Sequence, residues 1–209
     1  MPVVSRFTKN PAKRPAKNAV KRFRKPTPER LANIALYYLA RYAATEASLR
    51  RVLENRVRRA VMQDEAFAAD KEAHSVIAKA IDALVEQHKA SGVINDAAYA
   101  DMKVGSLRRA GRSARMISQK LAMKGIKNEA VSRALLSHEE DEGGDQEMKA
   151  ALLFAKRRKI GRFRDPAKAL LPPEAAAKQK NKEVASMARA GFSFDVIRKV
   201  LDADICADE

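Results

Sequence analysis

The sequence is poor in the residues that build disulfides, sheets and membrane spans. Its 209 residues include one cysteine, Cys206, which cannot form an intrachain disulfide and agrees with a reducing compartment. Tryptophan is absent and aromatic residues make up 5%, and no strand-like alternation of β-branched and aromatic residues has a useful length. The longest apolar run, residues 34–40, falls far short of the roughly 20 residues that a spanning helix needs. No apolar core of a secretory signal is present near the start. We therefore expect a cytoplasmic protein without a membrane partner.

Residue patterns typical of enzymes are also missing. The histidines are His74, His88 and His138, and none is paired with another His, Cys or carboxylate at metal-ligand spacing. His88 continues an apolar helix face, which favours a boundary position over a ligand. Cys206 lies among acidic residues, which disfavour the thiolate that a nucleophile needs. No phosphate-binding glycine motif or nucleophile motif occurs. We expect no catalytic residue, no cofactor and no metal.

The residues that are abundant favour helices. Ala, Leu, Arg, Lys and Glu dominate, and these are good helix formers. Apolar residues make up 46% and charged residues 33%, a balance that suits thin, extended packing better than one round core. Hydroxyl or amide residues precede segments with apolar residues at helical spacing. These predicted N-caps are Thr27, Thr45, Asn95, Ser113, Asn128 and Ser193.

Two later segments repeat one another around a glycine followed by an apolar residue. The pairs of matching positions are Leu121 and Met187, Gly125 and Gly191, Val131 and Ile197, and Leu135 and Leu201. A glycine at a helix end admits the left-handed conformation that reverses the chain. An earlier segment shows the same order more loosely, with Val57 where the glycine would fall. Each unit is thus predicted to hold a helix, a glycine turn and a short capped helix.

The predicted organisation is all-α, an elongated array of three tandem three-helix repeats behind a disordered or irregular basic tail. One such unit buries little apolar surface, so stacking of neighbours makes the core continuous. An acidic stretch, residues 139–142, followed by two glycines is the predicted junction before the last unit. The predicted segments are residues 1–26 (tail), 27–92, 93–138 and 139–209 (repeats), with a proline-containing insertion near 165–180. We expect a monomer.

The charge of the chain favours a polyanionic partner. The formal net charge is +16, which suits nucleic acid, an anionic membrane surface or an acidic protein groove and does not choose among them. The tail holds basic residues and no acid, so it is either a disordered tail or an arm that tracks phosphates, and these interpretations are compatible. Its composition also fits a transit peptide or a nuclear signal, which nothing else supports. The nucleic-acid candidates of the tail are Lys13, Arg14, Lys17, Lys21, Arg22, Arg24 and Lys25.

Two further basic clusters follow in the predicted repeats. Each residue alone could belong to a solvated helix face, but as a set they predict a positive surface for acidic loops or phosphates. Arginine suits this because its fork binds carboxylate and phosphate bidentately. The partner-binding candidates are Arg108, Arg109, Arg112, Arg115, Lys120 and Lys124 in the first cluster and Arg157, Arg158, Lys159, Arg162 and Arg164 in the second.

Three segments in the right order resemble the RecX family. Residues 92–126 resemble its most characteristic stretch, residues 188–201 its last helical pair and residues 30–56 its opening pair. The positions that carry the central match are Tyr99, Ala100, Arg108, Arg109, Ile117, Leu121, Gly125 and Ile126. The chain departs from the family in Tyr99, where Phe is usual, in a longer stretch at 61–74, in the insertion and in the tail.

The resemblance implies a regulator of the RecA recombinase. RecX-like proteins bind RecA and its filament on single-stranded DNA, in the setting of DNA repair, recombination and the SOS response. They limit filament extension, ATP hydrolysis and strand exchange, and they lie as tandem three-helix repeats in the filament groove. Some also bind DNA weakly. The alternative is a sequence-nonspecific DNA- or RNA-binding helical protein, since each helix–turn–helix unit could be read as a DNA-binding one, although its recurrence fits a repeat better.

Overall fold

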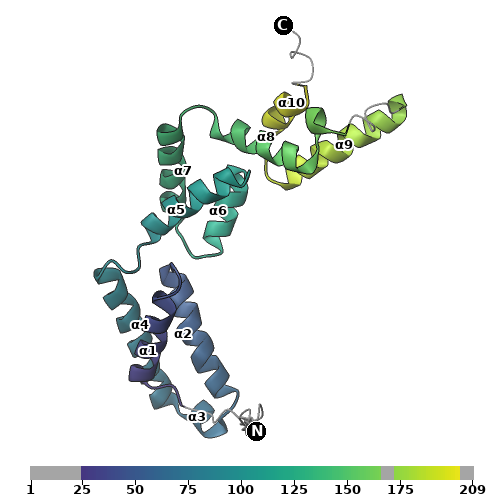
Figure 1. Ribbon diagram of the computed structural model, residues 1–209. Helices are drawn as coiled ribbons and strands as arrows, with labels where there is room; N and C mark the ends of the chain where they lie inside the picture. The colour runs from purple at the N-terminus through teal and green to yellow at the C-terminus, as the bar shows by residue number, and fades with distance from the viewer. Residues whose placement is uncertain (1–24, 166–171, 203–209) are drawn as a thin grey trace, which may run out of the picture.

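The structure, a computed structural model, describes residues 25–165 and 172–202, and every regular element in these ranges is helical (Figure 1). The all-α prediction is confirmed. The elements are α1 (Pro28–Leu39), α2 (Glu46–Val61), α3 (Glu65–Ala69), α4 (Lys71–Ala90), α5 (Asp96–Arg109), α6 (Ala114–Ala122), α7 (Asn128–Glu142), α8 (Gln146–Arg158), the 3-10 turn η1 (Gly161–Phe163), α9 (Pro173–Arg189) and α10 (Phe194–Asp202).

Most helices begin where the sequence predicts. The side chains of Thr27, Thr45, Asn95 and Ser113 each accept a hydrogen bond from the backbone N–H three residues on, which satisfies a donor that the first helical turn leaves free. The prediction for Asn128 is wrong, because Asn128 is the first residue of α7 and the capping position before it makes no side-chain cap.

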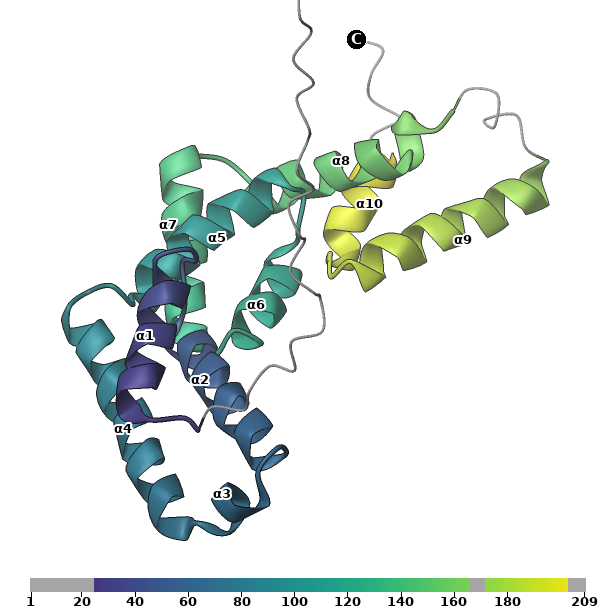
Figure 2. The ribbon, with the colours of Figure 1, turned by 60° about the horizontal axis from the view of Figure 1, so that its bottom comes forward.

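Three separate clusters of buried apolar residues hold the helices together. The first unites α1 to α4 around Leu31, Leu53 and Phe67, all at most 1% exposed. The second, in α5 to α7, includes Ile117, and the third, in α8 to α10, includes Met187. We call these sets of helices the first, second and third groups. They follow one another along an extended molecule in both views (Figures 1 and 2).

The structure departs from the predicted repeat at three places. Helix α2 runs without a break through Val57 to Val61, so the loose equivalent of the glycine turn predicted there is wrong. Helix α7 continues through the acidic stretch, and the chain turns at Gly143 and Gly144, both with positive φ. Helix α9 starts at Pro173, so the end of the predicted insertion is helical, while its residues 166–171 lie outside the described ranges.

The junction between the first and second groups includes two hydrogen bonds from the start of α2, beside one from the Arg51 side chain to the backbone oxygen of Met123. The Thr45 hydroxyl, which caps α2, donates to the backbone oxygen of Lys124 at 2.7 Å. The next backbone N–H, that of Glu46, donates to Oδ1 of Asp96 at 3.0 Å, in the first turn of α5. The cap of one group is therefore also a contact to the next group.

The junction between the second and third groups repeats this pattern. The Ser113 hydroxyl, which caps α6, donates to the backbone oxygen of Ala190 at 2.6 Å. The next backbone N–H, that of Ala114, donates to Oε2 of Glu147 at 2.9 Å, in the first turn of α8. In both junctions the N-cap hydroxyl and the first N–H of a group's second helix therefore donate to equivalent places in the following group. These are the turn after its second helix and the first turn of its first helix.

Glycine is required in both junctions. Gly125 and Gly191 have φ of +79° and +88°, which L side chains rarely adopt. A Cβ at Gly125 would lie 2.2 Å from Cβ of Ala47, and one at Gly191 would lie 2.6 Å from Oγ of Ser113. The recurring glycine that the sequence reveals therefore reverses the chain and also lets the neighbouring group approach.

Candidate partner-binding surface

The first basic cluster begins with a residue that lies inside the molecule. Arg108, at the end of α5, is 5% exposed, and its guanidinium forms an ion pair and hydrogen bond with Glu147. Glu139 lies 3.9 Å from the same group. Because Glu147 also accepts from the N–H of Ala114, Arg108 is part of the second junction. Its guanidinium is therefore buried within the molecule and not on the surface that the sequence predicts for it.

The other arginines of the cluster lie between the end of α5 and the first turn of α6. Arg109 and Arg115 are exposed and Arg112 is half-buried. Arg115 borders the second junction, since its Cβ would lie 3.3 Å from a Cβ at Gly191. The structure thus brings these arginines to the side where the third group packs.

Lys120 and Lys124 lie at the opposite end of α6. Lys120 is half-buried in the last turn, and the side chain of Lys124 is exposed. The backbone oxygen of Lys124 accepts from Thr45 in the first junction. The sequence predicts that the four arginines crowd the joint before α6 and that the two lysines lie one turn apart along it. In the structure the arginines lie near the start of α6 and the lysines near its end.

The second basic cluster closes α8. Arg157, Arg158 and Lys159 are exposed, and Lys159 adopts the left-handed conformation, with φ of 54°, that ends the helix. The guanidinium of Arg162 lies 4.9 Å from the ring centroid of Phe163, a cation–π contact that leaves the residue on the surface.

Arg164 is engaged within the third group. Its guanidinium donates two hydrogen bonds to Glu183, at 3.1 and 2.8 Å, and the Glu183 side chain is 4% exposed. Burial would raise the pKa of Glu183, but hydrogen bonds from Arg164, Gln179 and the N–H of Gly161 outweigh it and leave that pKa below its ordinary value. This carboxylate ties η1 to α9.

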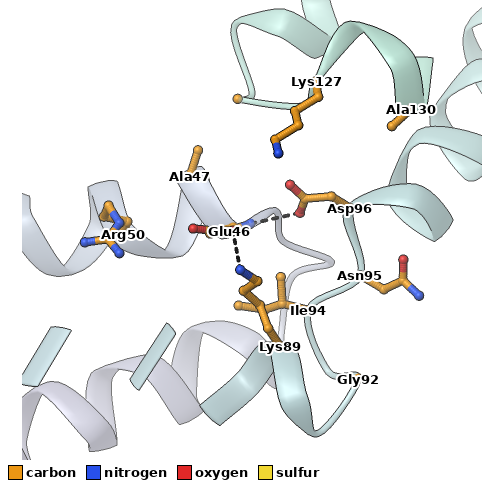
Figure 3. Close-up of a pocket in the computed structure, with 11 residues that line it drawn as sticks. Glu46, Ala47, Arg50, Lys89, Gly92, Ile94, Asn95, Asp96, Lys127 and Ala130 are labelled. Atoms are coloured by element: carbon orange, nitrogen blue, oxygen red, sulfur yellow. Dashed lines mark hydrogen bonds and ion pairs between the residues drawn. The ribbon is translucent and has the colours of Figure 1, made fainter. Parts of the chain in front are cut away.

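A pocket of about 640 Å³ lies at the first junction, between α2, α4, α5 and the start of α7 (Figure 3). Most of its charged side chains are held by contacts that the structure shows. Lys89 Nζ lies 3.0 Å from Oε2 of Glu46, Asp96 accepts from the backbone of Glu46, and Arg50 is held by Asp82 at 2.5 Å. The pocket belongs to the junction and adds mixed charge to the surface.

The remaining predictions concern the basic tail, metal binding and membrane spans. Of the tail candidates, Lys13, Arg14, Lys17, Lys21, Arg22 and Arg24 lie outside the described ranges, and Lys25 is exposed. Between residues 25 and 165 and between 172 and 202, no three His, Cys, Asp or Glu side chains are placed to hold a metal ion. None of the helices in these ranges is both long and apolar enough to cross a bilayer.

Comparison with known proteins shows to which family the chain belongs. The family model described as RecX, second three-helix domain, matches residues 95–135, which include the whole of α5 and α6 and the first half of α7. The Regulatory protein RecX of Myxococcus xanthus is 38% identical over 186 residues, covering 88% of this chain and 90% of that protein. The chain belongs to the RecX family. The resemblance predicted from the three segments is therefore confirmed.

Two further RecX proteins support the assignment and the fold. The Regulatory protein RecX of Agrobacterium fabrum is 36% identical over 108 residues, which is 52% of this chain and 51% of that protein. The crystal structure of RecX from Lactobacillus salivarius matches with a TM-score of 0.55 and 17% identity, covering 84% of this chain and 97% of that chain. At that identity the likeness shows the shared helical fold.

Proposed function

We propose that this RecX chain is a non-catalytic regulator that binds RecA and the RecA filament on single-stranded DNA. It would limit filament extension, ATP hydrolysis and strand exchange, acting as a cytoplasmic monomer in DNA repair and recombination. The observation that carries the proposal is the 38% identity to a regulatory RecX protein over 88% of the chain. The regulatory role named for that relative is the basis for transferring the function.

The arrangement of the helices supports action on a polymer. The three groups follow one another in an extended molecule (Figure 1), and repeated hydrogen bonds fix each junction. A stack of this kind offers a long surface rather than one enclosed cavity. Contacts spread along it would engage neighbouring RecA subunits together, and such multivalent contacts strengthen binding without any single strong site.

The exposed cations supply the proposed contacts. Guanidinium and ammonium groups on α6 and at the end of α8 complement acidic loops or phosphates. Arg108 and Arg164 would act indirectly, because both are paired with internal carboxylates. The residues proposed to face the partner are Arg109, Arg112, Arg115, Lys120, Lys124, Arg157, Arg158, Lys159 and Arg162.

The test is the DNA-dependent ATPase of RecA, measured with increasing amounts of this protein at several salt concentrations. A filament regulator inhibits at far below one molecule per RecA, also at salt that abolishes its own DNA binding. A protein that merely covers DNA, the alternative that the net charge of +16 supports, inhibits only near saturation and loses its effect steeply with salt. That second pattern, or no inhibition, would reject the proposal.

Matched charge variants locate the surface. Replacing Arg109 and Arg115 by Gln should weaken inhibition. Arg115 is exposed beside Gly191 of the second junction, and Arg109 is exposed and lines a hollow together with residues of α8. Replacing Lys71 and Lys79 by Gln removes the same charge from exposed positions of α4 and should leave inhibition near that of the unaltered protein. Equal weakening by the two variants would mean that net charge, and not this surface, sets the activity.

A further inference from the structure

The tyrosines of the chain gather at one place. The chain has four tyrosines. Tyr37 and Tyr38 lie in α1, Tyr42 follows its end, and Tyr99 lies in the first turns of α5. The rings of Tyr38 and Tyr42 are 5.3 Å apart between centroids. The hydrogen bond from the backbone N–H of Glu46, four residues after Tyr42, to Asp96, three residues before Tyr99, brings the segment after α1 to the start of α5. Burial raises the pKa of the Tyr99 hydroxyl, and Tyr38 raises it further. We call these four residues the tyrosine patch.

Two rings of the patch face solvent. The side chains of Tyr37 and Tyr42 are 61% and 57% exposed, and the neighbouring Leu36 is 58% exposed. Tyr38 and Tyr99, by contrast, pack partly against the first and second core clusters. Each residue of the inner pair therefore packs on the core of its own group, whereas Tyr37 and Tyr42 belong to neither cluster. Exposed apolar surface that is gathered in this way marks an interaction site.

Cations accompany the rings. The guanidinium of Arg41 lies 4.1 Å from the ring centroid of Tyr37, and Nζ of Lys103 lies 5.6 Å from that of Tyr99. The acids nearest to Tyr99 on α5 are Asp101, which helical geometry turns about 200° around the axis, and Asp96, which lies near the same face and whose Oδ1 accepts from the backbone N–H of Glu46. The carboxylate of Glu46, four residues after Tyr42, is paired with Lys89 at 3.0 Å. The single acid of α1, Glu29, is at its opposite end. The patch thus combines aromatic faces with positive charge.

We propose that the tyrosine patch is a stacking platform for single-stranded nucleic acid. Unpaired bases stack on exposed aromatic rings regardless of sequence, and cations beside the rings neutralise the phosphates between those bases. A duplex offers its bases to one another and has no free base face for Tyr37 or Tyr42. This inference goes beyond the proposed regulation of RecA and does not depend on it.

Intrinsic tyrosine fluorescence of the full chain provides a direct test. The chain has no tryptophan, and its four tyrosines are the patch, so the emission reports on this surface. Titration with an oligo-dT of about 15 nucleotides, within the site sizes of single-strand binders, should quench the emission in a saturable way. A duplex of equal length should quench it far less.

Variants assign the binding to the rings. Tyr37→Leu combined with Tyr42→Leu should weaken binding of labelled oligo-dT, followed by anisotropy, by about tenfold or more. Tyr37→Phe with Tyr42→Phe keeps the aromatic faces and should bind within about twofold of the unaltered chain. Both positions are exposed, so circular dichroism should give the same helix content for all three proteins.

Three results would overturn the inference. These are oligo-dT binding by the leucine variant at unaltered strength, equal quenching by duplex, and no quenching at all. If the leucine variant keeps its oligo-dT affinity but loses inhibition of RecA, the patch is a protein-binding surface instead. Because the oligo-dT measurements contain no RecA, a chain that fails to inhibit RecA leaves their outcome intact, so the two proposals fail separately.

Discussion

Alanine at Gly125 would test whether the first two helical groups interlock as the structure indicates. Gly125 has φ of +79°, and an added Cβ would lie 2.2 Å from Cβ of Ala47. Carbon atoms in contact prefer about 3.5–4.0 Å, so the start of α2 must move away from the glycine turn. That movement also strains the hydrogen bond from Thr45 to the backbone oxygen of Lys124.

The expected loss of stability has three contributions. Left-handed backbone costs an L residue about 1–2 kcal/mol, and overpacking of a close contact costs about 1–3 kcal/mol. Weakening the junction hydrogen bond adds about 1 kcal/mol. Gly92→Ala is the matched control, because Gly92 has φ of +73° but nothing within 4 Å of its Cβ position. We therefore expect Gly125→Ala to lower the free energy of unfolding by about 2–4 kcal/mol more than Gly92→Ala does.

Urea denaturation followed by far-ultraviolet circular dichroism measures this difference. Hydrogen exchange at the start of α2 and in the turn after α6 should also speed up in Gly125→Ala and stay unchanged there in Gly92→Ala. Equal losses of free energy in the two variants would refute the reasoning, since only the backbone conformation is common to both.

Three further predictions concern other parts of the chain. Glu147→Ala leaves the buried guanidinium of Arg108 without its main partner and should lower the free energy of unfolding, measured by urea denaturation, by about 3 kcal/mol. The control Glu140→Ala, at an exposed position, should lower it by about 0.5 kcal/mol or less. Similar losses in the two variants would contradict the buried ion pair. Despite its burial, Glu183 has a pKa held by hydrogen bonds below its ordinary value of 4.5, so the stability it contributes is present above that value and is lost as pH falls through the depressed pKa. Glu183→Gln should accordingly flatten the dependence of unfolding free energy on pH below about pH 4.5, and an unchanged slope would count against it. Deleting residues 1–26 should weaken DNA binding more than inhibition of RecA, and equal loss of both in parallel assays would reject that division.

Local signals made much of the fold predictable. A hydroxyl residue just before a segment with apolar residues at helical spacing predicts where a helix starts. Thr45 and Ser113 both cap their helices as expected. The recurrence of Gly125 and Gly191 likewise marks equivalent turns. Their second role, at the junctions, was not predictable, because the partner of each hydroxyl lies 77 or more residues away.

The candidate site was less predictable, because the sequence does not show which basic side chains are paired with carboxylates inside the folded chain. Arg108 has the same sequence setting as Arg109, yet one is buried against Glu147 and the other is exposed. Arg164 is bound to Glu183, 19 residues away on α9, a partner that its own sequence setting does not reveal. The tyrosine patch was missed for the same reason, since the segment after Tyr42 reaches the start of α5 only through the hydrogen bond between Glu46 and Asp96, residues 50 positions apart.

The length of RecA filaments on single-stranded DNA, seen by electron microscopy, tests the central claim most directly. Filaments assembled with ATP should become markedly shorter when this protein is added at a small fraction of the RecA concentration and at salt that prevents its own DNA binding. Filaments of unchanged length under those conditions, from a chain whose helical fold is intact by circular dichroism, would contradict the account.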